Sequence, residues 1–117
     1  MAKHNELGQH GESIARQYLE KKGHQILETN WRTGRAEIDI ITKWNDILVF
    51  VEVKTRSDNY FGEPEDFINQ KKKDLLIGAA GIYMELVHHD WEIRFDVIAI
   101  IIKNDHPYIK HIEDAFW

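Results

Sequence analysis

Two segments rich in β-branched and aromatic residues, 38–41 and 49–56, constrain this chain more than any other part of it. Their composition predicts two β-strands. Between them, Trp44-Asn45-Asp46 indicates a tight turn. Antiparallel strands joined by a short turn form a hairpin. If the loop has two or four residues centred on Asn45-Asp46, residue 39 lies opposite residue 52.

In that register two carboxylates face each other in an apolar hairpin. Asp39 would oppose Glu52, and Lys54 would share their face because strand side chains alternate with a period of two. Like charges held about 5 Å apart are destabilising, so the pair predicts a cation between them. A bulge or a three-residue loop would shift the register by one residue and turn Asp39 to the other face.

The composition is typical of a soluble globular protein. Hydrophobic residues make up 43% of the 117 positions and charged residues 30%, and we expect residues 1–117 to form one domain. We expect a cytoplasmic protein, since there is no apolar signal core and no apolar run near the roughly 20 residues that span a bilayer. The absence of cysteine excludes thiolate metal sites. The net charge of −5 argues against tight non-specific binding of nucleic acid but leaves room for a local basic rim.

Hydrophobic periodicity predicts a mixed α/β domain. The expected elements are a helix over 5–22, a strand over 24–31, the hairpin over about 36–55, a helix from Pro64 to about Leu86, a strand over 91–102 and a short strand over 108–112. The strands on either side of the second helix should be parallel, and the two helices should cover opposite faces of the sheet.

Glu12 lies at the border of the apolar stripe of the first helix, between Gly8 and Ala15. One interpretation is a boundary glutamate that reaches water. The alternative is a carboxylate that leans over the sheet edge toward Asp39 and Glu52.

Asp39, Glu52 and Lys54 form an Asp-x12-Glu-x-Lys pattern on adjacent strands. Carboxylate oxygens suit Mg²⁺ or Mn²⁺, and such an ion could polarise a phosphate and lower the pKa of a bound water. Lys54 could orient that water or stabilise transition-state charge. Gln70, near the start of the next helix, could position Lys54 or the phosphate. The pattern indicates metal-assisted phosphodiester hydrolysis, with a surface ion cluster as the alternative.

Motifs along nearly the whole chain carry a family resemblance. They are Gly11-Glu12, Ala15, Tyr18-Leu19, Gly23, Asn30-Trp31-Arg32, Glu37-Ile38-Asp39-Ile40-Ile41, Val49-Phe50-Val51-Glu52-Val53-Lys54-Thr55-Arg56 and Arg94-Phe95-Asp96-Val97. Through them the sequence resembles the YraN-like family of small, largely uncharacterised bacterial proteins. Ala36 departs from the family pattern, which usually has glycine there.

That family is similar to the restriction endonuclease-like superfamily, which includes archaeal Holliday junction resolvases. The resemblance implies a restriction endonuclease-like α/β fold of order α-β-β-β-α-β(-β). It also implies catalytic roles for Asp39, Glu52 and Lys54. Finally, it implies that Glu12 corresponds to a helical acidic residue at the metal, that Gln70 corresponds to a helix residue of the site, and that the carbonyl of Val53 faces the metal.

We therefore expect a Mg²⁺- or Mn²⁺-dependent endonuclease that hydrolyses phosphodiester bonds in branched or structured DNA during repair or recombination. The alternative is a catalytically silent nuclease-fold module that binds nucleic acid or a protein. The residues expected to contact phosphates at the rim are Arg32, Arg35, Arg56, Lys71, Lys72 and Lys73. Cutting both strands of a junction needs two active sites, so a junction substrate predicts a homodimer. The choice between DNA and RNA stays open.

Overall fold

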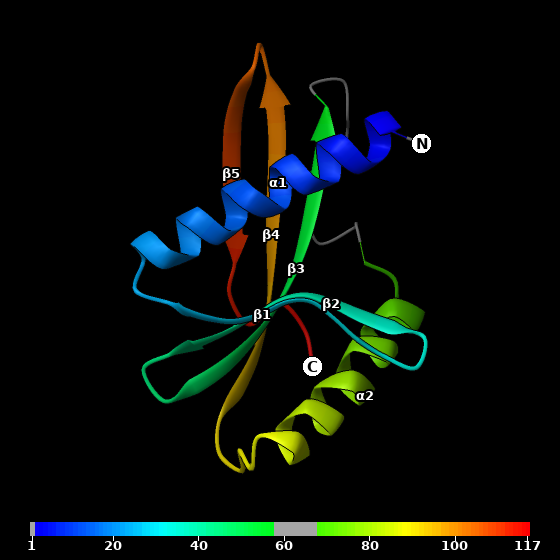
Figure 1. Cartoon of the computed structure of the whole chain (residues 1–117), viewed down its shortest axis with the longest axis vertical. Coiled ribbons are helices and arrows are strands. Elements are labelled where there is room, and N and C mark those ends of the chain that lie inside the picture. The colour runs from blue at the N-terminus through cyan, green and yellow to red at the C-terminus, as the bar shows by residue number, and fades with distance from the viewer. Residues whose placement is uncertain (1, 58–67) are drawn as a thin grey trace.

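The computed structural model describes residues 2–57 and 68–117. Its elements are α1 (Ala2–Lys21), β1 (Gln25–Thr33), β2 (Ala36–Trp44), β3 (Ile47–Ser57), α2 (Gln70–Leu86), β4 (Ile93–Lys103) and β5 (His106–Ile112). The strands form one sheet in the order β1-β2-β3-β4-β5 (Figure 1). The β3–β4 pair is parallel and the other pairs are antiparallel, so the predicted mixed α/β order is confirmed. None of the helices in the described ranges is long and apolar enough to span a membrane.

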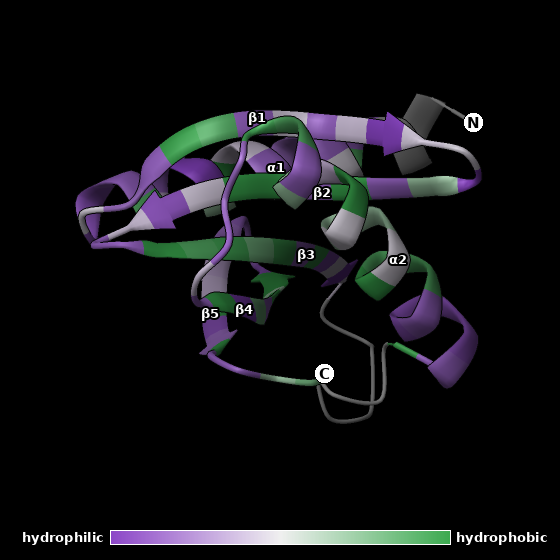
Figure 2. Ribbon diagram, turned by 90° about the horizontal axis from the view of Figure 1, so that it is seen from below, coloured by the Kyte–Doolittle hydropathy of each residue, from purple (hydrophilic) through white to green (hydrophobic). Residues whose placement is uncertain are grey.

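Each helix covers one face of the sheet, as the apolar periodicity predicts. On the α1 side, Ala15 and Leu19 pack against β3 and β4 residues such as Val51 and Ile98. On the α2 side, Leu76 and Tyr83 of α2 belong to the second buried cluster. Strand β3 lies between the two clusters and is hydrophobic along most of its length (Figure 2), because it is buried on both faces.

The hairpin register agrees with the expectation. Pairing runs from Trp44–Ile47 to Ile40–Val51, which leaves a two-residue turn at Asn45-Asp46. Asn45 has a φ of 55°, a left-handed conformation that Asn tolerates and that two-residue hairpin turns require. The pairing ends one residue short of the predicted Asp39–Glu52 pair.

The second helix begins later than the sequence suggested. The predicted start at Pro64 lies outside the described residues, and Ile68 and Asn69 precede the helix. Asn69 is its N-cap: its side-chain oxygen accepts a hydrogen bond of 2.9 Å from the backbone N–H of Lys72. An Asn cap satisfies a helix donor that would otherwise lack a partner, which favours a start at Gln70.

Helix α1 packs tightly against Thr55 of β3 at Gly11. A Cβ atom built there would overlap the Thr55 hydroxyl and lie 2.8 Å from the Thr55 Cβ, whereas a Cβ at Gly8 would meet nothing within 4 Å. Gly11→Ala is therefore expected to lower the free energy of unfolding by about 1–3 kcal/mol through overpacking. Gly8→Ala, the matched control, should gain up to about 1 kcal/mol from helix propensity. Urea denaturation measures both, and equal effects would show that Gly11 is not needed for packing.

Candidate functional site

The candidate site is a cavity of about 290 Å³ in the fork where β2 and β3 separate. Backbone pairing between the two strands stops at Ile40–Val51. Beyond this point β2 runs toward one side of the molecule while β3 continues toward the top of Figure 1. The amino-terminal part of α1 and the first turn of α2 complete the walls. The cavity collects these predicted site residues: Glu12, Asp39, Glu52, Val53, Lys54, Arg56 and Lys72.

A break in the alternation of β2 turns Asp39 into the fork. Ile38 belongs to the α2-side core, but Ile40, two residues later, belongs to the α1-side core. On the neighbouring strand, Asn30 has a φ of 52° at the same level. Asp39 Oδ2 therefore reaches across the fork and accepts a 2.8 Å hydrogen bond from the backbone N–H of Val53.

Glu52 is the buried centre of the site, with 3% of its side chain exposed. Its Oε2 atom lies 3.3 Å from Lys54 Nζ and 3.5 Å from Lys72 Nζ. Its Oε1 atom is buried and has no hydrogen-bond partner among the described residues. A buried carboxylate oxygen without a partner is costly unless a ligand completes it.

The two opposed carboxylates cannot both ionise cheaply. Burial, followed by the negative charge of Glu52, raises the pKa of Asp39 to about 8, although the hydrogen bond from Val53 acts in the opposite direction. Burial also raises the pKa of Glu12, and the charges of Glu37 and Glu52 add to this effect. Asp39 therefore holds a proton at neutral pH, in a place where a cation could replace it.

The donor chemistry of the fork fits a hard divalent cation. Asp39 and Glu52 offer carboxylate oxygens, of which Glu52 Oε1 has no hydrogen-bond partner among the described residues when both acids are ionised, and Glu12 lines the same cavity. Within residues 2–57 and 68–117, however, no three carboxylate or imidazole groups already converge as a ligand cluster. Glu12 would have to move toward the two strand carboxylates to complete a three-acid site.

The raised pKa of Asp39 has a consequence for stability in the absence of metal. Between about pH 4 and pH 8 the folded state holds a proton on Asp39 that the unfolded state has released, so the stability contributed by Asp39 is lost as pH rises through this window. Asp39→Asn stays neutral and keeps an acceptor for Val53. Relative to wild type, the variant should gain stability by up to about 1.4 kcal/mol per pH unit across the window. Urea denaturation in EDTA at several pH values tests this, and parallel pH curves would contradict it.

Gln70 lies outside the cavity. Its side-chain amide is exposed and donates a 2.9 Å hydrogen bond to Asp74 Oδ1 one turn along α2. The helix residue that reaches the site is Lys72, which the sequence placed only at the phosphate-contacting rim. Because α2 starts at Gln70, its third residue rather than its first faces Glu52.

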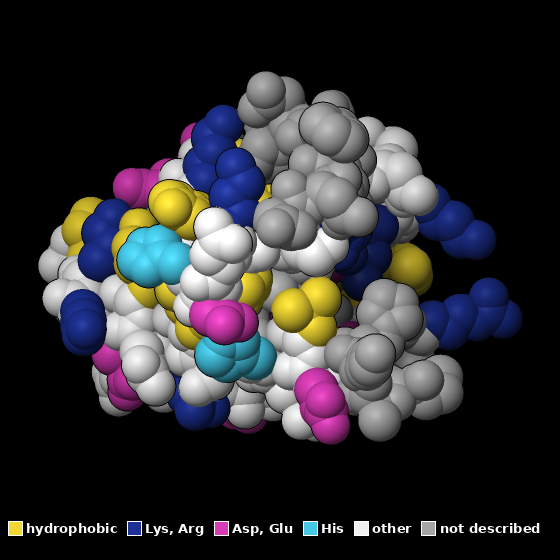
Figure 3. Space-filling view, turned by 90° about the horizontal axis from the view of Figure 1, so that it is seen from above, with side chains coloured by type: hydrophobic (Ala, Val, Ile, Leu, Met, Phe, Trp, Pro, Cys, Tyr) yellow, Lys and Arg dark blue, Asp and Glu magenta, His cyan; other side chains and the backbone are white. Residues whose placement is uncertain are grey.

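The other predicted rim residues are dispersed. Arg32 is exposed and pairs with Glu37 at 3.0 Å, and Arg35 is exposed in the turn that follows β1. Lys71 is exposed on α2, while Lys73 Nζ lies 5.8 Å from the centre of the Phe116 ring. Figure 3 views the end of the molecule where β3 and β4 finish, and there Lys and Arg side chains are interspersed with acidic and histidine side chains. Among the described residues that Figure 3 draws in colour, Lys and Arg side chains form no continuous basic patch on this face.

Sequence reasoning missed a second polar cluster, centred on the fully buried Asp96. Asp96 accepts hydrogen bonds from Arg94 Nε at 2.8 Å, Arg94 Nη2 at 2.9 Å, His111 Nε2 at 2.7 Å and the backbone N–H of Asp114 at 3.1 Å. His111 Nδ1 in turn lies 3.2 Å from the Tyr18 hydroxyl of α1. Burial alone would raise the pKa of Asp96, but the hydrogen bonds from His111 and Arg94 outweigh it and lower this pKa.

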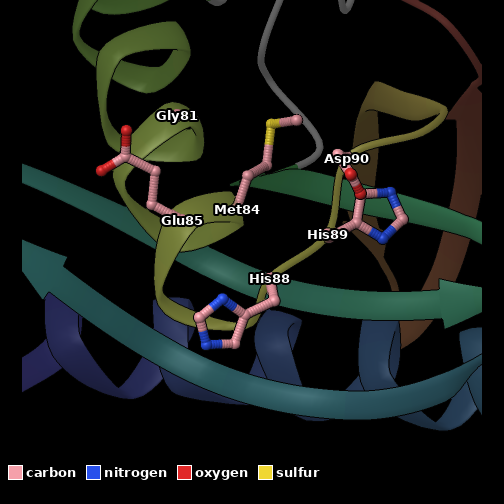
Figure 4. A pocket seen from close by; sticks show the side chains of 6 residues that line it. All are labelled: Gly81, Met84, Glu85, His88, His89 and Asp90. Atoms are coloured by element: carbon pink, nitrogen blue, oxygen red, sulfur yellow. The ribbon is translucent and has the colours of Figure 1, made fainter.

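A larger cavity of about 590 Å³ lies at the carboxyl end of α2 (Figure 4). Its lining includes Met84, Glu85, His88 and His89. The two histidine rings point away from each other in Figure 4, and His89 Nε2 is 2.8 Å from the carbonyl oxygen of Glu92. This cavity lacks the paired carboxylates and lysines of the fork, so the fork is the stronger candidate.

Comparison with known proteins supports the family resemblance. A family described as "Uncharacterised protein family UPF0102" matches residues 11–100, which include Glu12, Asp39, Glu52 and Lys54. The UPF0102 protein of Flavobacterium psychrophilum is 50% identical over 117 residues, covering 100% of this chain and 98% of that protein. The UPF0102 protein of Parabacteroides distasonis is 44% identical, covering 100% of this chain and 97% of that protein.

Among solved structures, the chain is similar to Pyrococcus furiosus SfsA in complex with Ca²⁺. The TM-score is 0.36 and the identity 17%, over 94% of this chain and 63% of that chain, a similarity too distant to inform the site. The family match and the full-length relatives settle the membership: this chain belongs to the uncharacterised protein family UPF0102.

Proposed function

We propose that this protein is a Mg²⁺- or Mn²⁺-dependent phosphodiester hydrolase that acts on nucleic acid, and on branched or structured DNA in particular. The observation that carries the proposal is the pair of opposed carboxylates, Asp39 and Glu52, in one cavity with Lys54, where Glu52 Oε1 is buried and has no partner among the described residues when both acids are ionised. The preference for branched DNA rests on the resemblance to junction-resolving nucleases.

In this proposal Asp39 and Glu52 would hold the cation, and Glu12 would be the third acid. The bound cation would polarise phosphate oxygens and lower the pKa of an attacking water. Asp39 must first release its proton, and because its pKa is raised to about 8 this release is more complete near pH 8 than near pH 6. Lys54, held 3.3 Å from Glu52, keeps an ammonium group at the cavity where negative charge develops on the phosphate. Arg56 lines the same cavity and adds to the attraction for phosphate.

A catalytically silent module that binds nucleic acid or a protein is the second candidate. It is favoured by the lack of a converged three-acid cluster in the part of the chain that the structure describes. Such a module would use the lysines and Arg56 of the fork for phosphate binding without a metal.

Thermal unfolding with and without Mn²⁺ separates the two candidates. Ligand at 100 times its dissociation constant stabilises the folded state by about 2.7 kcal/mol, which raises the Tm of a domain of this size by several degrees. Wild type and the control Glu20→Gln, an exposed change on α1 outside the cavity, should show this rise. Asp39→Ala should not.

A cleavage assay then tests the reaction on a four-way junction, a forked duplex and a linear duplex. We expect Mn²⁺-dependent cleavage, preferentially of the junction or fork, which Asp39→Ala abolishes. Binding to these substrates without a metal response and without cleavage would instead support the silent module.

A further inference from the structure

Lys72 makes a contact that a solvent-facing helix lysine would not make. It lies in the first turn of α2, yet its Nζ atom is 3.5 Å from Oε2 of the buried Glu52, on a different element. The neighbouring lysines behave differently, since Lys71 is exposed and Lys73 lies against the Phe116 ring. Of the three consecutive lysines, only Lys72 lines the fork cavity.

Two lysine ammonium groups lie beside the Glu52 carboxylate, although one would be enough to neutralise its single negative charge. Lys54 already approaches the same oxygen at 3.3 Å. The ammonium of Lys72 therefore sits beside a carboxylate that is also the best candidate ligand for a divalent ion. A divalent ion at Glu52 would be a third cation beside Lys54 and Lys72, and repulsion between these like charges would favour displacement of one lysine, so Lys72 and a metal at Glu52 would compete.

The two lysines differ in their freedom to move. The Lys54 side chain is 24% exposed and projects from the interior strand β3, whereas that of Lys72 is 38% exposed and projects from the end of a helix. Lysine combines a compact charge with a flexible four-carbon stem, so the more exposed Lys72 can swing its ammonium toward the mouth of the cavity at little cost. At the mouth it would meet an incoming phosphate.

We propose that Lys72 occupies the cation position beside Glu52 in the metal-free protein and becomes a phosphate-binding residue once a divalent cation takes that position. This inference rests on the proposed function. It makes substrate binding depend on metal through a residue that is not itself a ligand, because only the metal-loaded protein presents a free Lys72 ammonium to the nucleic acid.

Calorimetric titration with Mn²⁺ alone tests the competition. Lys72→Met keeps the length, the apolar stem and the helix propensity of the side chain but removes its charge. It is expected to bind Mn²⁺ at least about threefold more tightly than wild type, since a partly exposed ion pair and a cation–cation repulsion are both removed. Lys71→Met, the matched control one residue away, should bind Mn²⁺ like wild type. Lys72→Arg keeps the positive charge and should also bind Mn²⁺ like wild type.

Binding of a fluorescein-labelled four-way junction, in EDTA and in Ca²⁺, tests the second half of the proposal. In Ca²⁺, Lys72→Met should weaken binding of the junction and reduce the slope of log K against log salt by about one, which corresponds to one lost phosphate contact. In EDTA the variant should bind the junction like wild type. Lys71→Met, which removes an exposed lysine, should change the affinity for the junction equally in EDTA and in Ca²⁺. An effect of Lys72→Met that is equal in the two buffers would overturn the proposal.

The outcomes separate this inference from the proposed function. If wild type binds Mn²⁺ and Lys72→Met binds it equally or more weakly, the competition is refuted and the metal site stands. If both proteins bind Mn²⁺ and Lys72→Met binds it more tightly, Lys72 competes with the metal in the free protein, as proposed. If neither protein binds Mn²⁺, the proposed function fails and the inference fails with it.

Discussion

Replacing Asp96 with Asn is expected to lower the free energy of unfolding by about 3–5 kcal/mol, because the change removes one partner of a buried ion pair and leaves the other. Asp96 is fully buried and accepts hydrogen bonds from Arg94, from His111 and from the backbone of Asp114. An Asn side chain of the same shape carries no charge and turns an NH₂ group toward these donors. With a total stability of about 5–15 kcal/mol, such a loss is visible in either thermal or urea unfolding.

The matched control is Glu113→Gln. Glu113 approaches the same guanidinium at 3.5 Å but is 48% exposed, so its loss should cost no more than about 1 kcal/mol. A loss below 1 kcal/mol for Asp96→Asn would show that Arg94 and His111 find other acceptors when the charge is removed.

The pH dependence offers an independent check on Asp96. Because its pKa is lowered in the folded state, the stability that it contributes is present above its ordinary pKa near 3.8 and is lost as pH falls toward its folded value. Wild type should therefore lose stability in acid more steeply than Asp96→Asn, and the two unfolding curves should approach each other at low pH.

If the protein hydrolyses phosphodiester bonds as proposed, replacing Lys54 with Met is expected to reduce the rate by about 10²–10³, the usual effect of removing one group that stabilises transition-state charge. The stabilisation of the fold by Mn²⁺ should persist in this variant, since Asp39 and Glu52 are unchanged. Metal-free stability should fall only modestly, because Lys72 still pairs with Glu52 at 3.5 Å.

The control for Lys54 is Lys43→Met, which removes an exposed lysine on β2 outside the fork cavity. It should leave the proposed cleavage of DNA at the wild-type rate. If Lys54→Met also cleaves at that rate, Lys54 has no catalytic role and only neutralises Glu52. A double variant that lacks Lys54 and Lys72 would then be less stable than the two single variants together predict, because Glu52 would be a buried charge without a partner.

Local sequence predicted the hairpin at the centre of the site. A two-residue turn at Asn45-Asp46 determines the register, which holds as far as Ile40–Val51 and brings Asp39 next to the strand segment that carries Glu52 and Lys54. Likewise, the period of the apolar residues was sufficient to predict two helices on opposite faces of a mixed sheet. These features depend on contacts between residues near in the chain or on a simple repeat, so a single sequence contains them.

The start of α2 was also encoded locally but was missed. Pro64, Glu65 and Asp66 resemble a helix start, while Asn69 is an equally good cap five residues later, and the structure uses Asn69. This difference decided which side chain reaches the site. With the helix beginning at Gln70, Gln70 bonds to Asp74 at the surface and Lys72 approaches Glu52.

By itself, the sequence determined the order of the elements, the register of the hairpin and the residue types that meet in it. Only the tertiary structure decided the environment of those residues. The fork between β2 and β3 buries Glu52, leaves its Oε1 atom without a partner among the described residues and brings Lys72 from a distant helix. The Asp96 cluster joins α1, β4, β5 and the carboxyl-terminal segment in the same way. The physical reason is that burial, and the charges that compensate for it, depend on elements far apart in the chain, whereas turn geometry and side-chain alternation depend on neighbours.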